Sequence, residues 1–457
     1  MNYTDTYAPV VNLRTIRCLF ALAAYLDLEV HHMDVTTAFL NAELPEDERA
    51  YMQLPPGYQK EDGSTMALLL QKSLYGLKQA PRLWHQDLHR TVTSADFPLK
   101  LRKSWADECL YVGKNMAITL YVDDLLLFSL GTDLIMKVKD ALMANYDMKY
   151  LGEVKKFLGI RVTRDRSRKL IRLNQEEYIQ SILEKFGFVN VKTRATPLPP
   201  NIQLSKASDS VNQMPLTAEE ANLYRSMLGS SGYAALGTRP DLTYTVGKLG
   251  QYSSCPTEEH WQAMDWHFRY LAGTKDLGLE YDGNVFHFHG FSNADWAQTF
   301  GEPQHARKST SGYTYQLCNA SISWSSKLQS TVATSSTEAE VIASNHAGKE
   351  GVWLRKLLKD LQLLSNDPIL QNKQETTTLY VDNTSSMVIS SEPGNQQRTK
   401  HYDVAYFWIR ERLQRGELVL VYKPTEDMTA DIFTKSLPKP AHNRHVHELG
   451  LRVEPKL

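Results

Sequence analysis

Two adjacent carboxylates lie inside an apolar run between Met116 and Phe128, which reads MAITL, YVDD, LLLF. A buried carboxylate without a partner would cost several kcal/mol, so these charges must be neutralised, exposed at a turn or bound to cations. The pattern predicts two strands joined by a tight turn that displays Asp123 and Asp124. Such a turn is suited to a hard cation such as Mg²⁺, which takes oxygen ligands and shares them with phosphates. An acidic turn without a ligand is the alternative.

Length, charge and cysteine content limit the class of protein. The chain has 457 residues, 42% of them hydrophobic, which is enough for two or three domains. Its net charge is −1, so binding of nucleic acid would depend on local basic patches. The apolar stretch 18–28 is too short to span a bilayer, so we expect no membrane segment and an intracellular protein. The scattered cysteines argue against a zinc site or disulfides; they are Cys18, Cys109, Cys255 and Cys318.

Hydrophobic spacing divides the chain into helices and strands. The predicted helices lie at 15–28, from 80 onward, at 134–146 and over 216–271, the last beginning near Thr217. A strand over 30–35 ends at Asp34, the segment 195–214 has the prolines and serines of a linker, and a second α/β unit begins near 278.

The densest basic patch of the sequence lies over 163–172, where we predict a turn between two strands. A solvated charged hairpin and a phosphate contact both explain such a run, and its place after the acidic turn favours the phosphate contact. The charged residues are Arg164, Arg166, Arg168, Lys169 and Arg172.

Asp34 opens a second segment, DVTTAFLN, at the end of its predicted strand. A third carboxylate from a separate strand would complete a two-metal site for in-line phosphoryl transfer. Between Asp34 and the acidic turn lies SLYGLKQAPRLW, a glycine turn that leads into a proline-started helix at Pro81, and after the acidic turn comes FLGI. In this order the four segments resemble the reverse transcriptase of the Pol polyprotein of copia-type (Pseudoviridae) LTR retrotransposons.

The resemblance implies an RNA-directed DNA polymerase whose metal ligands are Asp34, Asp123 and Asp124, with Asp124 the more peripheral, and whose cofactor is Mg²⁺ or Mn²⁺. It implies that Phe39 is a steric gate against the ribose 2′-hydroxyl, whereas a simple core residue is the alternative. It further implies a primer-grip turn. It also implies a loop and helix that pack beneath the template and the incoming nucleotide, where a small residue lets the backbone approach a base pair. The implied nucleotide- and template-binding residues are Phe39, Tyr75, Gly76, Gln79, Ala80, Pro81, Phe157, Leu158 and Gly159.

The second half of the chain continues the resemblance. The segments GFSNADW, RKSTSG, SSTEAE, VDN and ADIFTK occur in this order and are similar to a copia-type ribonuclease H domain. That domain hydrolyses the RNA strand of an RNA–DNA hybrid with two metals held by four carboxylates. Glu340 fits the family's helix pattern better than Glu338 does. The implied catalytic and metal positions are Asn293, Glu340, Asp382 and Asp431.

Asn293 departs from the family pattern, which has aspartate at this position. A neutral amide oxygen cannot bridge two divalent ions with negative charge, so we expect weaker metal binding. Asp295 would lie one pleat further along a strand, roughly 6.6 Å away, which is too far for a clean replacement. The basic segment 398–401 (Arg398 to His401) is either a contact to hybrid phosphates or a solvated loop. The family's basic fingers hairpin has no counterpart before Tyr3, and we expect weak nucleotide binding for that reason.

The sequence therefore predicts a multidomain protein of mixed α and β structure. The expected parts are partial fingers and palm at 1–165, thumb and connection at 166–275, and a ribonuclease H-like α/β domain at 276–457. The expected partners are RNA and DNA template-primer, RNA–DNA hybrid and deoxynucleoside triphosphates. The rival hypothesis is a truncated, non-catalytic retrotransposon remnant that at most binds nucleic acid. By family resemblance we expect the protein to be located in the cytoplasm, in virus-like particles, or in the nucleus.

Overall fold

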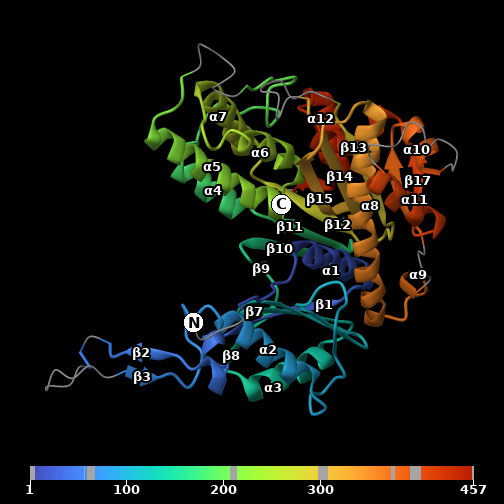
Figure 1. Cartoon of the computed structure of the whole chain (residues 1–457). Coiled ribbons are helices and arrows are strands. Elements are labelled where there is room, and N and C mark those ends of the chain that lie inside the picture. Colours follow the sequence, from blue (N-terminus) through green and yellow to red (C-terminus); the bar gives the residue numbers. More distant parts are fainter. Residues whose placement is uncertain are drawn as a thin grey trace. The chain divides into compact units, whose positions relative to one another are not determined.

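A computed structural model of the chain describes residues 6–55, 57–58, 67–205, 214–296, 307–371, 376–391 and 403–454. Tyr3 and the basic segment 398–401 lie outside these residues. The chain forms two compact units (Figure 1). The first unit comprises Met1–Ile16, Leu28–Val154 and Leu357–Gln371, and the second comprises Arg17–Asp27, Lys155–Lys356 and Asn372–Leu457.

The first unit is built on a six-stranded sheet of order β4-β5-β6-β7-β1-β8. Its central strands β6 and β7 are apolar at nearly every position and buried along most of their length, as in a sheet that is covered on both faces. Two helices pack on this sheet, α2 (Ala80–Thr93) and α3 (Thr132–Asn145). The strands are β1 (Glu29–Val35), β4 (Arg102–Lys103), β5 (Leu110–Gly113), β6 (Met116–Tyr121), β7 (Asp124–Ser129) and β8 (Met148–Glu153).

Smaller elements of the first unit flank this sheet. A two-stranded ribbon joins β2 (Tyr51–Gln53) to β3 (Ala67–Leu69), and the short 3-10 helix η1 (Ala38–Leu40) follows β1. The helix α1 (Leu13–Leu26) starts in the first unit and continues into the second.

The second unit contains a helical layer with a shared apolar core. Thr217 forms a capping box with Glu220 at the start of its longest helix, which confirms the helix start expected there. The helices are α4 (Glu176–Lys185), α5 (Ala218–Gly237), α6 (Thr243–Gly250) and α7 (Glu258–Gly273).

Two sheets complete the second unit. One has the order β18-β12-β11-β10-β9, with β9 (Lys156–Phe157), β10 (Ile160–Asp165), β11 (Leu170–Asn174), β12 (Leu277–Asp282) and β18 (Leu451–Val453). The other has the order β15-β14-β13-β16-β17, with β13 (His289–Ala294), β14 (Thr310–Leu317), β15 (Ala320–Leu328), β16 (Thr377–Val381) and β17 (Leu418–Tyr422). In this last sheet β13 is antiparallel to β14 but parallel to β16.

The remaining helices lie in the C-terminal part of the chain (Figure 1). The longest, α8 (Ser336–Leu361), runs from the second unit into the first. The others are α9 (Pro368–Gln371), α10 (Thr384–Ser391), α11 (Asp403–Gln414), the 3-10 helix η8 (Thr429–Phe433) and α12 (Lys439–Glu448).

The mixed α and β fold class with several sheets is confirmed. Helices are present at each expected place, but the helical stretch expected over 216–271 is divided into α5, α6 and α7. The basic segment 163–172 forms the β10–β11 hairpin, as expected. Several of its charges are engaged within the second unit: Arg164 and Arg166 pair with Asp27, and buried Arg172 donates to the carbonyls of Asp276 and Arg452. In the described part of the chain, no helix combines the length and apolar character needed to cross a bilayer.

A fully buried ion pair fixes the helical layer. Arg239 and Asp241, which are 0% and 1% exposed, form two parallel hydrogen bonds of 2.9 and 2.6 Å. Tyr270 donates to the same carboxylate at 2.7 Å, and Arg239 also donates to the carbonyl of Thr274 at 2.8 Å. Every member has a partner, so the network holds α7 and the start of α6 together without an orphaned charge.

We predict that Arg239→Met destabilises the second unit by about 3–5 kcal/mol, because Asp241 would remain buried without its cation. The matched control is Arg269→Met, which breaks the partly exposed Arg269–Asp265 pair and should cost about 1 kcal/mol or less. Urea unfolding of both variants measures the difference. Equal losses in the two variants would contradict the role given to the buried pair.

Candidate functional site

Three carboxylates of the first unit lie where β1 and β6 end and β7 begins. Asp34, near the end of β1, lies directly opposite Asp124, the first residue of β7. Tyr121 at the end of β6 pairs with Asp124 at the start of β7, so the two residues between them, Val122 and Asp123, form a tight turn. The backbone N–H of Val35 donates to the Asp123 carbonyl at 2.8 Å, which fastens the turn to β1. Residues distant in sequence are thereby gathered into one site, called here the palm cluster: Asp34, Asp123 and Asp124.

The turn itself has a strained backbone. Val122 adopts a φ of 55°, in the left-handed region that a β-branched residue rarely enters. Its carbonyl accepts a 2.8 Å hydrogen bond from the indole Nε1 of Trp84 on α2. This bond anchors the turn to the helix of the SLYGLKQAPRLW segment, and strained backbone of this kind is common where a site must be held in one geometry.

The two adjacent aspartates have different surroundings. His32 Nε2 lies 2.7 Å from Asp124 Oδ1, and His32 is the diagonal neighbour of Asp124 across the β1–β7 pair. Asp123 Oδ2 accepts a hydrogen bond of 3.4 Å from Tyr75, whereas its Oδ1 is buried without a hydrogen-bond partner among the described residues. Asp124 is therefore partly committed to a histidine, and Asp123 keeps a free carboxylate oxygen.

Electrostatics distinguish Asp123 further. Burial raises the pKa of the Asp123 carboxyl, the hydrogen bond from Tyr75 lowers it, and the nearby Asp34 and Asp124 raise it again. A carboxyl group whose pKa is raised by neighbouring like charges marks a place where a cation would be stabilised. The oxygen donors and the free Oδ1 fit a hard divalent cation. Within the described ranges, no group of three or more His, Cys, Asp or Glu side chains is arranged so that it could hold a metal ion.

Two aromatic rings border the palm cluster. Phe39 lies in η1, and its ring centroid is 4.7 Å from that of Tyr75. Phe39 is half-buried, while Tyr75 is 48% exposed and reaches Asp123 through its hydroxyl. Phe39, the predicted gate residue, therefore contacts Tyr75, and Tyr75 in turn contacts Asp123 of the palm cluster.

The remaining predicted nucleotide-contact residues fall into two groups. Gly76 is exposed with a φ of 97°, and a Cβ there would meet no atom within 4 Å, so the turn conformation alone requires glycine. Gln79 and Ala80 are buried, and Pro81 lies at the start of α2, where its fixed φ is suitable.

The predicted primer-grip residues belong to the second unit. Phe157 is buried and pairs with Ile160 across a two-residue turn. Leu158 and Gly159 have φ values of 48° and 70°, as a hairpin turn of type I′ requires.

A second carboxylate cluster lies in the β15-β14-β13-β16-β17 sheet. Asn293 on β13 and Asp382, directly after β16, lie toward the carboxyl ends of two neighbouring parallel strands. Glu340 on α8 accepts a 3.0 Å hydrogen bond from the Ala294 backbone, next to Asn293. Asp431 in η8 accepts a hydrogen bond from the Asn293 amide. These residues form what is called here the second cluster: Asn293, Glu340, Asp382 and Asp431.

The second cluster is more buried than the palm cluster. Burial, together with Asp382 and Asp431, holds the pKa of Glu340 well above its usual range, and Glu340 Oε2 has no hydrogen-bond partner among the described residues. Burial also raises the pKa of Asp431, although Lys435, 2.8 Å from its Oδ2, opposes the shift. Thr425 donates to Asp382 Oδ2 at 3.0 Å. The free oxygen of Glu340 beside Asp382 fits a cation.

Neither alternative residue takes part in this cluster by hydrogen bonding. The Glu338 carboxylate accepts from the backbone and hydroxyl of Thr334, both at 2.7 Å, and so caps α8. Asp295 accepts from the Thr310 backbone N–H and extends the β13–β14 pairing. Burial raises the pKa of Asp295 to about 7.

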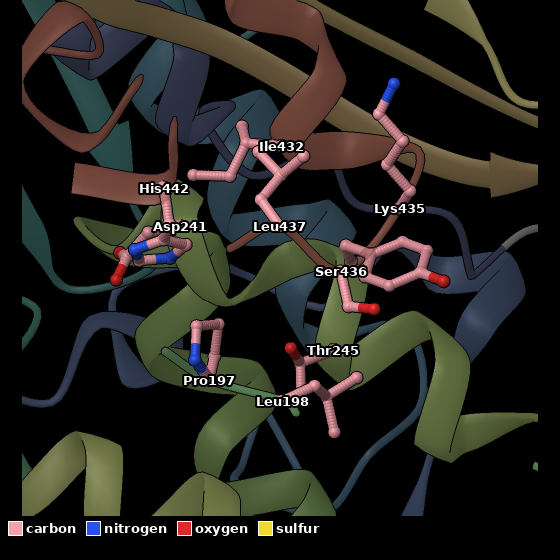
Figure 2. A pocket seen from close by; sticks show the side chains of 10 residues that line it. Pro197, Leu198, Asp241, Thr245, Ile432, Lys435, Ser436, Leu437 and His442 are labelled. Atoms are coloured by element: carbon pink, nitrogen blue, oxygen red, sulfur yellow. The ribbon is translucent and has the colours of Figure 1, made fainter. Parts of the chain in front are cut away.

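A pocket lies beside the second cluster, lined in part by Asp241, Thr245 and His442 (Figure 2). Lys435 contributes to its rim, but Figure 2 shows its side chain extending away from the pocket. The ammonium group of Lys435 is thus directed to Asp431 and serves the second cluster.

Three residues that contact the clusters or the turn between β6 and β7 were not predicted from the sequence: His32, Trp84 and Lys435. His32 lies two residues before Asp34. Residues two apart in a strand point to the same face, and this alternation was the only signal for His32 in the sequence. Trp84 closes the recognised SLYGLKQAPRLW segment, but its bond to the turn spans 38 residues of sequence. Lys435 lies four residues after Asp431, a spacing that permits an ion pair.

Comparisons with known proteins agree with these motifs. The profile of the family described as "Reverse transcriptase (RNA-dependent DNA polymerase)" matches residues 1–200. The retrovirus-related Pol polyprotein from transposon TNT 1-94 of Nicotiana tabacum is 37% identical over 449 residues, which are 96% of this chain and 32% of that protein. A protein attributed to transposon Ty5-1 of Saccharomyces cerevisiae is 31% identical over 324 residues, 70% of this chain and all of its own length.

A solved structure, the foamy viral protease-reverse transcriptase in complex with an RNA/DNA hybrid, aligns with 87% of this chain and 44% of its own. The sequence identity is 13% and the TM-score is 0.44, which is too low to assign a fold.

The first half of the chain is thus a reverse transcriptase family sequence. The chain as a whole belongs to the Pol polyproteins of copia-type retrotransposons, which confirms the resemblance predicted from the motifs. It spans about a third of the length of the tobacco relative that it matches.

We predict that Asp123→Asn raises the melting temperature of the metal-free protein by a few degrees near neutral pH. The pKa of Asp123 is raised in the fold, so its ionised form opposes folding above the unfolded pKa, and this cost grows as the pH rises through the folded pKa. At about pH 3, where the carboxyl is protonated in both states, the substitution should change little.

The control is Asp124→Asn, which loses the charge that His32 binds and should give no such gain. Thermal melts at both pH values test the difference between the two aspartates. Equal shifts for the two variants would contradict it.

Proposed function

We propose that the palm cluster catalyses templated addition of deoxynucleotides to a primer, that is, RNA-directed DNA polymerisation. The observation that carries this proposal is the placement of Asp34 directly opposite Asp124, with Asp123 in the adjoining turn, all in a chain of the reverse transcriptase family. The proposed partners are RNA or DNA template-primer and deoxynucleoside triphosphates.

The chain's own residues hold and orient the reacting groups in this proposal. When bound, Mg²⁺ or Mn²⁺ lowers the pKa of the primer 3′-hydroxyl and neutralises the triphosphate. Asp34 and Asp123 supply the ligand oxygens, and the turn that Trp84 anchors keeps Asp123 in place. His32 holds Asp124 at the edge of the site, in agreement with a peripheral role for that residue.

Phe39 is proposed to select the sugar. It is half-buried, and its ring packs at a tilt against Tyr75, which bonds to Asp123, so the Phe39 ring can border the position of an incoming ribose. A gate of this kind acts by steric exclusion of the 2′-hydroxyl and not by added affinity.

For the second cluster we propose hydrolysis of the RNA strand of an RNA–DNA hybrid, in the manner of a ribonuclease H. Glu340, Asp382 and Asp431 supply the carboxylates, and the unpartnered Glu340 Oε2 is the donor best placed for a cation. The second candidate, a site that binds hybrid without cleaving it, is favoured by one observation: Asn293 presents an amide to Asp431 where the family has a carboxylate.

We predict that Asp123→Asn reduces primer extension by orders of magnitude, because the developing phosphoryl charge loses its cation ligand. Asp124→Asn should reduce it less, because Asp124 is shared with His32. Extension of a labelled primer on RNA template, with Mg²⁺ and with Mn²⁺, gives both rates. Because the Asp123 variant is predicted to be no less stable than the parent, unfolding cannot explain its loss, and unchanged extension would refute the proposal.

We predict that Phe39→Ala raises incorporation of ribonucleotides relative to deoxynucleotides by at least about 10-fold. The matched control is Leu40→Ala, which removes a half-buried apolar side chain from the same short helix and should leave sugar discrimination unchanged. Single-nucleotide extension assays and thermal melts separate the two effects. Loss of stability by Phe39→Ala with unaltered discrimination would establish a packing role instead.

A further inference from the structure

The two oxygens of Asp431 are both engaged by groups of the chain itself. The Asn293 side chain donates to Oδ1, and the Lys435 ammonium lies 2.8 Å from Oδ2. Asp431 is 5% exposed, so little water competes with these contacts. Charge-assisted hydrogen bonds of this type are about twice as strong as neutral ones. A divalent ion could coordinate Asp431 only after displacing one of them.

The orientation of the Asn293 amide follows from its neighbours. Its Oδ1 accepts a 2.8 Å hydrogen bond from the Ala294 backbone N–H while its Nδ2 faces the Asp431 carboxylate. The flipped amide would place two donors against each other at Ala294 and two acceptors against each other at Asp431. Asn293 therefore presents N–H groups, and not an oxygen, to the interior of the second cluster.

At Glu340, on the other side of the second cluster, a carboxylate oxygen lacks a hydrogen-bond partner among the described residues. Glu340 Oε1 accepts from the Ala294 backbone at 3.0 Å, but its buried Oε2 has no hydrogen-bond partner among the described residues. Asp382 uses Oδ2 for the Thr425 hydroxyl at 3.0 Å. Burial raises the pKa of Glu340, and the negative charge of the nearby Asp382 raises it further.

We infer that the Lys435 ammonium and the Asn293 amide together fill the cation position at Asp431, so that the second cluster takes a single divalent ion, held by Glu340 and Asp382. Three carboxylates opposed by one ammonium leave a net charge that one divalent ion balances. An aspartate at position 293 would add a fourth carboxylate and remove the donor that now occupies Asp431 Oδ1. The count of ions does not depend on the proposed ribonuclease H role; only its consequence for hydrolysis rests on that proposal.

The test counts Mn²⁺ on the full chain by calorimetry and by electron paramagnetic resonance of the free ion. The palm cluster is silenced in all proteins by Asp34→Asn and Asp123→Asn. In this background we expect one Mn²⁺, lost on Glu340→Gln. Lys435→Met should tighten Mn²⁺ binding by about 10-fold, the scale on which neighbours of a metal site act. Lys435→Met combined with Asn293→Asp should bind two ions.

Two controls isolate the ammonium group. Lys435→Arg keeps a cation at Asp431 and should retain one ion with unaltered affinity, whereas Lys439→Met removes a lysine from an exposed position of the same region and should change nothing. Thermal melts verify that each variant is folded. Two ions on the parent, no ion on the parent, or one ion on both the parent and the Lys435→Met, Asn293→Asp variant would each overturn the inference.

Cleavage of a labelled RNA–DNA hybrid is measured on the same proteins. This assay tests the proposed ribonuclease H function separately from the number of bound ions. If the ion counts follow the expectation but no variant cleaves hybrid, the proposed ribonuclease H function fails and the single-ion inference stands. If the variant with two ions cleaves hybrid faster than the parent, Lys435 and Asn293 are positioning residues that limit catalysis through metal binding.

Discussion

Like charges placed directly opposite each other in a sheet destabilise it, and the pairing of β1 with β7 nevertheless places Asp34 opposite Asp124. The surrounding structure compensates. His32 binds Asp124 and Tyr75 donates to Asp123. The Val35 backbone N–H and the Trp84 indole N–H both donate to backbone carbonyls of the turn and hold it in place. The sheet thus supports an arrangement of carboxylates that only a cation would relieve fully, and the proposed polymerase chemistry depends on this constraint.

The second cluster handles the same problem in another way. Its carboxylates are more deeply buried, so an uncompensated charge would be more costly there. The chain supplies its own compensation on one side, through the Lys435 ammonium and the Asn293 amide at Asp431. On the other side Glu340 keeps a free oxygen. The palm cluster therefore keeps a free Asp123 oxygen, whereas the second cluster is half satisfied by protein groups, although both belong to one Pol-type chain.

Local sequence predicted a large part of this structure. The strand, turn and strand around Asp123 followed from an apolar run interrupted by two carboxylates, and the helix after Thr217 followed from its capping pattern. The bond from Trp84 to Val122 and the pairing of His32 with Asp124 could not be predicted, because they depend on register between strands and on helix packing across distant segments. For Asp295, strand alternation predicted only which face of the sheet the side chain is on. Its hydrogen bond with the Thr310 backbone N–H could not be predicted, because that bond depends on where β13 ends.

The central proposal is that the two carboxylate clusters bind divalent cations. Fe²⁺ bound in place of Mg²⁺ generates hydroxyl radicals that cut the backbone close to the ion, and mass spectrometry locates the cuts. The account predicts cuts near Asp34 and the Val122–Asp123 turn, and near Glu340 and Asp382, all suppressed by excess Mg²⁺. Cuts elsewhere in the chain, or cuts at these positions that Mg²⁺ does not suppress, would contradict it.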